Sequence, residues 1–174
     1  MKKVFQLLII TIFLFALRSF EGSDTNYFMT DKEIANEYLE KIIEAVQNQD
    51  RDALKSMFSN NVLKEVQNMD ESIDELFDFY QGYMVSVADS VGPSVKGENH
   101  RGIVKKVIQI YRTVETSEKK YHIAIRAVVQ DTKFPDNVGL DALYIVETDK
   151  LDEPVYDLWM QDGEWLPGIT IQKR

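Results

Sequence analysis

The sequence has 174 residues, of which 44% are hydrophobic and 28% charged, and its formal net charge at pH 7 is −9. This length suits one domain with a substantial core and is short for two. The acidic balance argues against nucleic acid as a partner, because phosphates require a basic surface. The absence of cysteine excludes disulfides, thiol nucleophiles, cysteine metal sites and lipid attachment at a cysteine.

Residues 1–22 have the pattern of an export signal. Lys2 and Lys3 precede an apolar run over residues 4–17, and a short basic segment followed by ~7–15 apolar residues is typical of a secretory signal peptide. The run is short for a membrane span, which needs ~20 residues. No A-x-A cleavage motif is present, so an uncleaved membrane anchor stays open. We expect the protein to be extracytoplasmic, secreted or anchored at the outer face of the cytoplasmic membrane, and to meet the membrane only through this segment.

Residues 23–29 form a polar spacer, and residues 30–174 are predicted to be a single domain. The domain begins with a long helix over residues 30–49. Thr30 and Glu33 have the spacing of a capping box at its start. Apolar residues then recur at helical period, at Ile34, Tyr38, Ile42 and Val46. A stripe this wide requires a large partner surface.

Shorter helices are expected after the long one. Residues 51–58 follow Asp50, which is the predicted N-cap, and apolar spacing continues over residues 62–66 after a break. A third helix over residues 71–82 is expected to have Asp70 as its N-cap and to end at a glycine.

From Tyr83 the apolar period changes to two, which predicts strands. Gly92-Pro93 and Gly97 are expected to form a loop, and Asp162-Gly163 is a hairpin signal. The predicted strands cover residues 83–91, 103–115, 119–131, 140–148, 155–161 and 164–171. Helices followed by antiparallel strands predict an α+β fold, in which N-terminal helices pack on a curved, mostly antiparallel sheet.

Two motifs carry a resemblance to a known superfamily. The first, D-x-x-A-L-x-x-x-F, consists of Asp50, Ala53, Leu54 and Phe58. The second, W-x-x-D-G-x-W, consists of Trp159, Asp162, Gly163 and Trp165. Their order resembles the nuclear transport factor 2-like superfamily, which implies a cone-shaped, cystatin-like fold over roughly residues 30–172. Within it, the pattern is similar to a family of small exported Firmicutes proteins of unknown function, many of them lipoproteins, although this sequence lacks the lipobox cysteine. The resemblance implies no particular activity.

Two residues are candidates for catalysis. Enzymes of this fold, such as the ketosteroid isomerase-like members, use carboxylates, histidines and tyrosines that line the cone. His122 and Asp141 each alternate with the apolar residues of a predicted strand, and they meet on one sheet face if the registers match. A solvated cross-strand pair is the alternative. The acidic turn at Asp149, Asp152 and Glu153 matches no calcium loop, and no metal site or cofactor motif is predicted.

Eight aromatic residues fall on or near positions expected to face the core: Tyr38, Phe77, Tyr80, Tyr83, Tyr121, Tyr144, Trp159 and Trp165. They either fill the cone or line an apolar pocket in which tyrosine hydroxyls bind the ligand's polar groups. The favoured prediction is a non-enzymatic binding module for a small apolar ligand or a protein partner. A ketosteroid isomerase-like lyase or isomerase and a structural module that forms a homodimer are the alternatives.

Overall fold

The computed structural model of the protein describes residues 29–88, 92–148, 160–161 and 164–172. The predicted export signal, Trp159 and the Asp162-Gly163 turn lie outside the described residues. In the described ranges, no helix is both long enough and apolar enough to span a membrane.

Four helices precede the sheet in the described part of the chain: α2 (Asp31–Gln47), α3 (Arg51–Ser56), α4 (Asn60–Glu65) and α5 (Met69–Phe79). The capping box is confirmed, because the Glu33 carboxylate accepts from the Thr30 N–H at 2.7 Å and the Thr30 hydroxyl accepts from the Glu33 N–H at 3.3 Å. Asp50 caps α3 as predicted, by accepting from the Ala53 N–H at 2.9 Å.

The predicted cap of the third helix is wrong. The N-cap of α5 is Asn68, and Asp70 is the second residue of the helix, in its first turn. There its carboxylate pairs with the Lys55 ammonium at 2.7 Å, which joins α5 to α3. An acidic residue suits this first turn as well, because the helix N-terminus carries partial positive charge.

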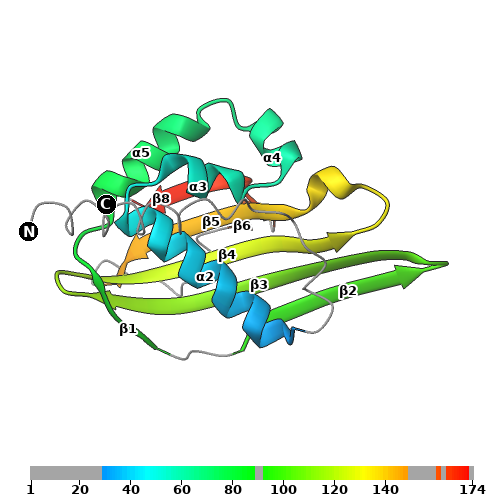
Figure 1. Ribbon diagram of the computed structural model, residues 1–174, viewed down its shortest axis with the longest axis horizontal. Helices are drawn as coiled ribbons and strands as arrows, with labels where there is room; N and C mark the ends of the chain where they lie inside the picture. Colours follow the sequence, from blue (N-terminus) through cyan, green and yellow to red (C-terminus); the bar gives the residue numbers. More distant parts are fainter. Residues whose placement is uncertain (1–28, 89–91, 149–159, 162–163, 173–174) are drawn as a thin grey trace, which may run out of the picture.

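A six-stranded sheet forms the other layer, with the order β1-β3-β4-β5-β8 and with β2 beside β1 on the same edge of β3 (Figure 1). Every pair is antiparallel except β5 with β8, which is parallel. The strands are β1 (Met84–Ala88), β2 (Ser94–His100), β3 (Ile103–Thr116), β4 (Lys120–Asp131), β5 (Gly139–Glu147) and β8 (Gly168–Gln172). A short 3-10 helix, η2 (Pro135–Asn137), links β4 to β5, and β6 (Met160–Gln161) pairs separately with β7 (Glu164–Trp165). The predicted α+β class is confirmed.

One predicted loop is wrong. The sequence pattern predicts a loop at Gly97, but Gly97 lies in the middle of β2, which pairs with β3 over seven consecutive positions. The hairpin turn is Arg101-Gly102, and both residues have positive φ, 52° and 82°. A two-residue turn with this geometry sets the register of the hairpin, so the pairing with β3 outweighs the low strand propensity of glycine.

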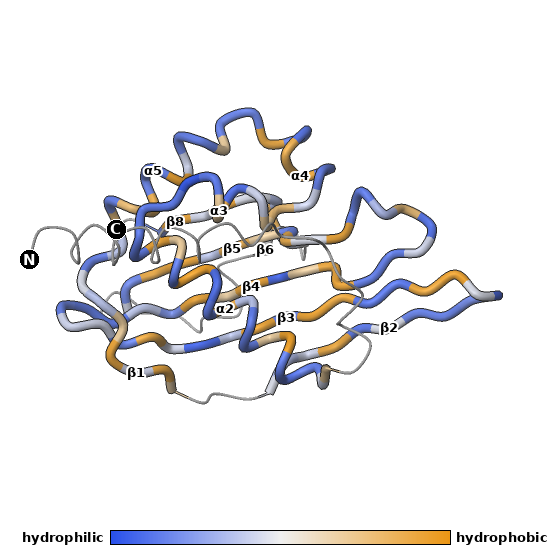
Figure 2. Tube along the Cα trace, viewed as in Figure 1, coloured by the Kyte–Doolittle hydropathy of each residue, from blue (hydrophilic) through white to orange (hydrophobic). Residues whose placement is uncertain are grey.

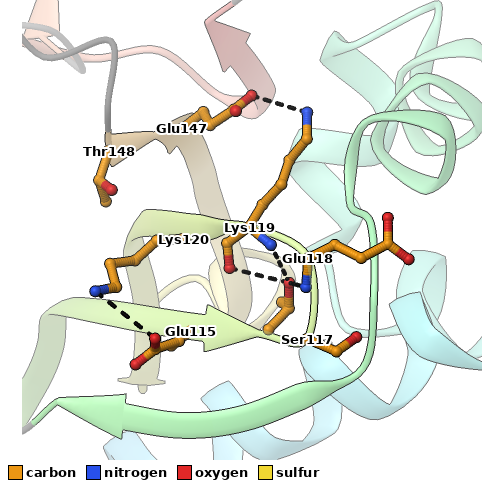
Figure 3. A pocket seen from close by; sticks show the side chains of 8 residues that line it. Glu115, Ser117, Glu118, Lys119, Lys120, Glu147 and Thr148 are labelled. Atoms are coloured by element: carbon orange, nitrogen blue, oxygen red, sulfur yellow. Dashed lines mark hydrogen bonds and ion pairs between the residues drawn. The ribbon is translucent and has the colours of Figure 1, made fainter.

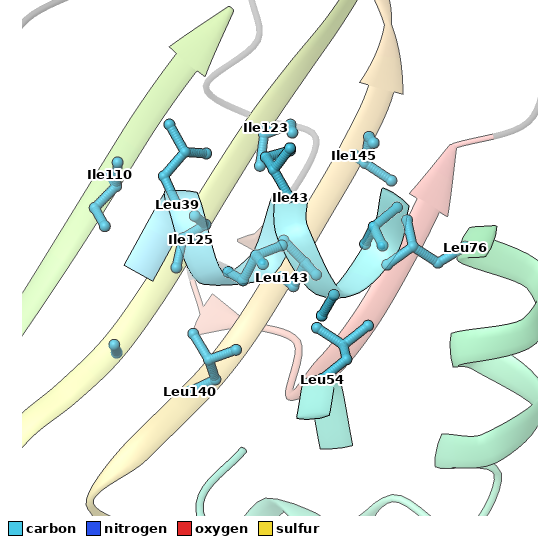
Figure 4. Close-up of a cluster of buried hydrophobic side chains, with 14 of the residues drawn as sticks. Leu39, Ile43, Leu54, Leu76, Ile110, Ile123, Ile125, Leu140, Leu143 and Ile145 are labelled. Atoms are coloured by element: carbon cyan, nitrogen blue, oxygen red, sulfur yellow. The ribbon is translucent and has the colours of Figure 1, made fainter. Parts of the chain in front are cut away.

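The core lies between α2 and the sheet, and in Figure 1 α2 runs across the strands. Figure 2 shows hydrophobic residues concentrated along β3, β4 and β5, with hydrophilic residues at the β3–β4 turn. In Figure 4 the side chains of Leu39 and Ile43 on α2 lie against the strands beneath, among Ile110, Ile123, Ile125 and Leu143. All six side chains are buried, so the apolar stripe of α2 fills the space over the middle of the sheet.

A register shift between Arg126 and Ala127 in the β4–β5 pairing changes which residues of β5 face each side of the sheet. Leu140 is opposite Ala127, but Ala142 is opposite Arg126, which leaves Asp141 as an extra residue. Leu140 therefore joins the core beneath the helices, whereas Tyr144 packs on the far face. The predicted placement of Tyr144 toward the main core is wrong.

Candidate functional site

An open hollow of about 390 Å³ lies at the β3–β4 turn and the end of β5 (Figure 3). We call it the turn hollow. Its lining residues are Glu115, Thr116, Ser117, Glu118, Lys119, Lys120, Glu147 and Thr148. The sequence predicts a turn here from Thr116-Ser117-Glu118, but it does not predict the approach of β5. Ligand sites in proteins span roughly 300–1,000 Å³, so the turn hollow is large enough for a small molecule.

Most charges around the turn hollow pair with each other. The Lys119 ammonium lies 3.0 Å from the Glu147 carboxylate, and the Lys120 ammonium lies 3.8 Å from that of Glu115. Glu147 is only 8% exposed. A carboxylate buried to this degree requires a cation or hydrogen-bond donors nearby, and Lys119 supplies one.

Thr116 fastens the turn to the connection between α5 and β1. Its hydroxyl donates to the Gln81 carbonyl at 2.7 Å and accepts from the Lys119 N–H at 2.8 Å. Gly82 follows, with φ of 79°, and a Cβ there would lie 2.7 Å from the Ser117 hydroxyl. Only glycine combines this backbone conformation with so close an approach, so residues 81–82 lie directly against the turn.

An aromatic cluster lies beside this contact. The Tyr121 ring is fully buried, stacks on Tyr80 with 5.1 Å between centroids, and tilts against Phe79 at 5.6 Å. The Tyr121 hydroxyl donates to the Phe79 carbonyl at 3.0 Å and accepts from the Gln81 N–H at 2.9 Å. One side chain of β4 therefore satisfies two backbone groups at the end of α5.

Tyr80 differs from its neighbour in how its hydroxyl is satisfied. The hydroxyl is buried and has no hydrogen-bond partner among the described residues. Burial raises the pKa of Tyr80 to about 12, so the group stays protonated. A buried hydroxyl without a partner costs free energy, which marks this position as one where a bound group would be accepted.

Tyr83 adds an exposed ring to the same region. Its N–H donates to the Ser117 hydroxyl at 3.2 Å, and its carbonyl accepts from the Ser117 N–H at 2.9 Å. The side chain is 68% exposed. Three of the eight predicted aromatic residues, Tyr80, Tyr83 and Tyr121, thus lie near the β3–β4 turn, although none of them lines the turn hollow itself.

The family model described as Domain of unknown function (DUF5104) matches residues 41–148. The chain belongs to this family. No curated protein matches the sequence. The matched range contains every residue that lines the turn hollow, together with the aromatic cluster and Tyr83, so the candidate site lies wholly within the DUF5104 domain.

The other predicted aromatic residues lie elsewhere in the domain. Tyr38 and Phe77 pack against the core beneath the helices, and burial raises the pKa of Tyr38 to about 12. Tyr144 and Trp165 belong to a cluster on the far face of the sheet, where the Trp165 ring lies 6.1 Å from that of Tyr111. None of these four lines the turn hollow, and Trp159 lies outside the described residues. The seven described positions do not form one pocket wall, and none of them lines the turn hollow.

The structure does not bring His122 and Asp141 together. The His122 partner on β5 is Val146, and its Nδ1 lies 2.8 Å from the Thr113 hydroxyl oxygen. Asp141 forms an ion pair with Arg126 instead. Both side chains are on the far face of the sheet, as alternation predicts, but the register separates them along the strands.

The carboxyls whose pKa shift is resolved are all stabilised as anions. The Lys55 ammonium lowers the pKa of Asp70, the Asn137 amide lowers that of Asp131, and the Lys64 ammonium lowers that of Asp136. Hydrogen bonds from Thr30 lower the pKa of Glu33. A carboxylate that abstracts protons in an apolar cavity has the opposite property, a raised pKa. In the described ranges, no group of three or more histidine, aspartate or glutamate residues could hold a metal ion.

Sequence reasoning missed Lys119 and Glu147, which lie 28 residues apart and pair only because β4 and β5 are neighbours. It also missed Thr116 as the residue that fastens the turn to Gln81. A charged residue directly after a run of apolar residues, as Glu147 is after residues 142–146 of β5, is the one signal in the sequence that a buried ion pair lies there.

We expect Tyr121→Phe and Tyr80→Phe to have different effects on stability. Tyr121→Phe leaves the Phe79 carbonyl and the Gln81 N–H without a partner, so the free energy of unfolding should fall by about 1–3 kcal/mol. Tyr80→Phe breaks no hydrogen bond in the described structure and should cost nothing or stabilise. Urea unfolding followed by circular dichroism measures both. Equal losses in the two variants would contradict the assignment of these hydroxyls.

We also expect His122 to make stability depend on pH. Burial lowers its pKa below the ordinary value of 6.5 for histidine, so the unfolded chain binds the proton first as the pH falls. The free energy of unfolding should therefore be fully present above pH ~6.5 and decline below it, toward the pKa of the folded state. His122→Asn should flatten this dependence, and His100→Asn, at an exposed histidine, should not. Identical pH profiles for wild type and His122→Asn would contradict the prediction that His122 causes this pH dependence.

Proposed function

We propose that this domain is a non-enzymatic binding module for a small ligand that combines an apolar part with one polar group, held at the turn hollow. The observation that supports it best is the buried Tyr80 hydroxyl without a partner. Tyr80 precedes Gln81 in the chain, and the Gln81 carbonyl accepts from Thr116 of the hollow; Tyr80 itself does not line the hollow. An unsatisfied buried hydroxyl costs about 1–3 kcal/mol, and a ligand group that hydrogen-bonds to it removes that cost.

The surroundings of Tyr80 suit such a ligand. The exposed Tyr83 ring, on a residue whose backbone bonds to Ser117 of the hollow, offers apolar surface, and aromatic rings with a polar end are common in binding sites. The Lys119–Glu147 pair offers fixed charges of both signs. The ligand would thus meet an aromatic surface on one side and paired charges on the other.

Binding is favoured over catalysis because most charged side chains of the turn hollow pair with each other. Lys119 and Lys120 are paired with Glu147 and Glu115. The alternative, a lyase or isomerase of the ketosteroid isomerase-like type, requires a base with a raised pKa in the cone. His122 and Asp141 do not supply it, since they lie on the far face of the sheet.

A protein partner is the second candidate, favoured by a run of exposed apolar residues at the start of β1. Tyr83, Met84 and Val85 are 68%, 37% and 60% exposed. Within the described residues, β1 pairs only with β3, so its other edge is open. An extended peptide can add to such an edge through main-chain hydrogen bonds. Both this peptide and the proposed small ligand would contact Tyr83.

We propose the nuclear transport factor 2-like assignment and export on the sequence patterns. Asp50 capping α3, with Leu54 and Phe58 buried behind it, supports the first; an experimental structure whose strands depart from that cone would contradict it. The basic and apolar pattern of residues 1–22 supports the second. The intact mass of the protein from the culture medium and the membrane fraction measures cleavage, and a full-length chain confined to the cytoplasm would rule export out.

Nile red, an apolar dye with a carbonyl group, tests the ligand site. Its fluorescence should rise on binding the folded protein. Tyr83→Ala should weaken the dissociation constant about tenfold, which corresponds to ~1.4 kcal/mol, and Tyr80→Phe should weaken it because the hydroxyl is lost. Phe134→Ala, at an exposed ring on the η2 loop, is the matched control and should not change it. Absence of binding, or an equal effect of Phe134→Ala, would overturn the proposal.

A further inference from the structure

We propose that β2 pairs antiparallel with β2 of a second copy of this chain, about a two-fold axis at Gly97. The pairing makes one continuous sheet across two copies. It does not depend on the ligand proposed for the turn hollow, because a different edge of the molecule carries it.

β2 is an open edge. All seven of its residues are exposed, and in the described part of the chain β2 pairs only with β3. The hairpin also extends beyond β4, whose pairing with β3 begins only at Lys105 (Figure 1). Exposed edges of this kind template pairing with another strand unless they are blocked. β2 has no proline and no bulge in its pairing with β3.

The hairpin turn determines which backbone groups of β2 face outward. Across a two-residue turn the flanking residues, His100 and Ile103, form a hydrogen-bonded pair, and bonded and non-bonded pairs then alternate. Val104 confirms the alternation. Its N–H donates to the Thr132 hydroxyl at 2.9 Å and its carbonyl accepts from the Thr132 N–H at 2.9 Å, so both groups point away from β2.

It follows that the Asn99–Val104 pair is non-bonded, and that Val95, Gly97 and Asn99 direct their N–H and C=O groups to the open edge. A two-fold axis at Gly97 places Gly97 opposite its own copy and Val95 opposite Asn99. Each outward N–H then meets an outward C=O. Gly97 has no side chain, and nothing lies within 4 Å of where its Cβ would be, so the two backbones can approach.

The charges fit this register. Lys96 is opposite Glu98 of the second copy, and Glu98 is opposite Lys96 of the second copy. These are non-hydrogen-bonded positions, where facing Cα atoms are only ~4.5 Å apart and opposite charges attract most. Within its own chain, Glu98 is opposite Lys105 on β3, so it would lie between two lysines in the dimer.

Neighbouring registers are disfavoured. An axis at Lys96 places the two Lys96 side chains opposite each other, and an axis at Glu98 does the same for two glutamates, so both bring like charges together.

The two ends of the β2–β2 pairing are defined as well. Pro93 has no N–H to extend the pairing, and at the other end β2 stops at His100, where the chain turns at Arg101-Gly102. One seven-residue strand buries less surface than the ~1,200 Å² of a stable interface, so the dimer forms in a concentration-dependent way.

Sedimentation velocity over a series of protein concentrations tests the pairing. The wild type should shift from monomer to dimer. Lys96→Glu and Glu98→Lys should each weaken the dimer at least tenfold, since each brings like charges together. An equimolar mixture of the two variants should dimerise again, because opposite charges then face each other, and so should the double variant Lys96→Glu/Glu98→Lys.

Two further variants complete the test. Gly97→Pro removes an outward N–H but no hydrogen bond to β3, so it should abolish the dimer while the chain stays folded by circular dichroism. Glu40→Lys, at an exposed position on α2, makes the same charge change as Glu98→Lys and should leave the dimer unchanged. A wild type that stays monomeric throughout, a single variant that behaves like Glu40→Lys, or a mixture that does not recover would each overturn the proposal. Nile red binding at low protein concentration should be the same for wild type and Glu98→Lys, which separates this test from that of the turn hollow.

Discussion

Burial of the apolar stripe of α2 against one face of the sheet is the interaction on which the rest of the domain depends. The side chains at Leu39, Ile42 and Ile43 are almost wholly removed from water, and burying one such side chain contributes about 1.5–3 kcal/mol. Since these side chains occupy the middle of the sheet, polar chemistry is displaced to the margins. The turn hollow, the exposed Tyr83 and the β2 edge all lie where the helix no longer covers the strands.

The margin near the turn is held by a few polar contacts rather than by bulk packing. Tyr121 links β4 to the end of α5, and Thr116 links the β3–β4 turn to Gln81. Both contacts bind backbone groups at or just after the end of α5, outside regular secondary structure. They explain why a polar hollow keeps its shape beside the apolar core. The ion pair between Lys119 and Glu147 also fixes the relative position of β4 and β5 at their ends, because opposite charges attract.

Local signals in the sequence predicted local structure well. The capping box at Thr30 and the alternation through Tyr121 and His122 depend only on neighbouring residues, and both are confirmed. The misplacements have non-local causes. Tyr144 changes face because the register with β4 shifts at Asp141, and Gly97 becomes part of a strand because β3 pairs with it. No local pattern reveals a shift of one residue between distant strands. Nor does it reveal that Val146 is opposite His122, which is why the predicted His122–Asp141 pair does not form.

The parallel position of β8 beside β5 has a consequence for how the chain reaches its folded state. β5 ends at Glu147 and β8 begins at Gly168, so the sheet is incomplete until nearly all of the sequence is present. Contacts between distant segments form late and slowly. In a chain with this topology, the pairing of β5 with β8 can form only after residues 168–172 have left the ribosome.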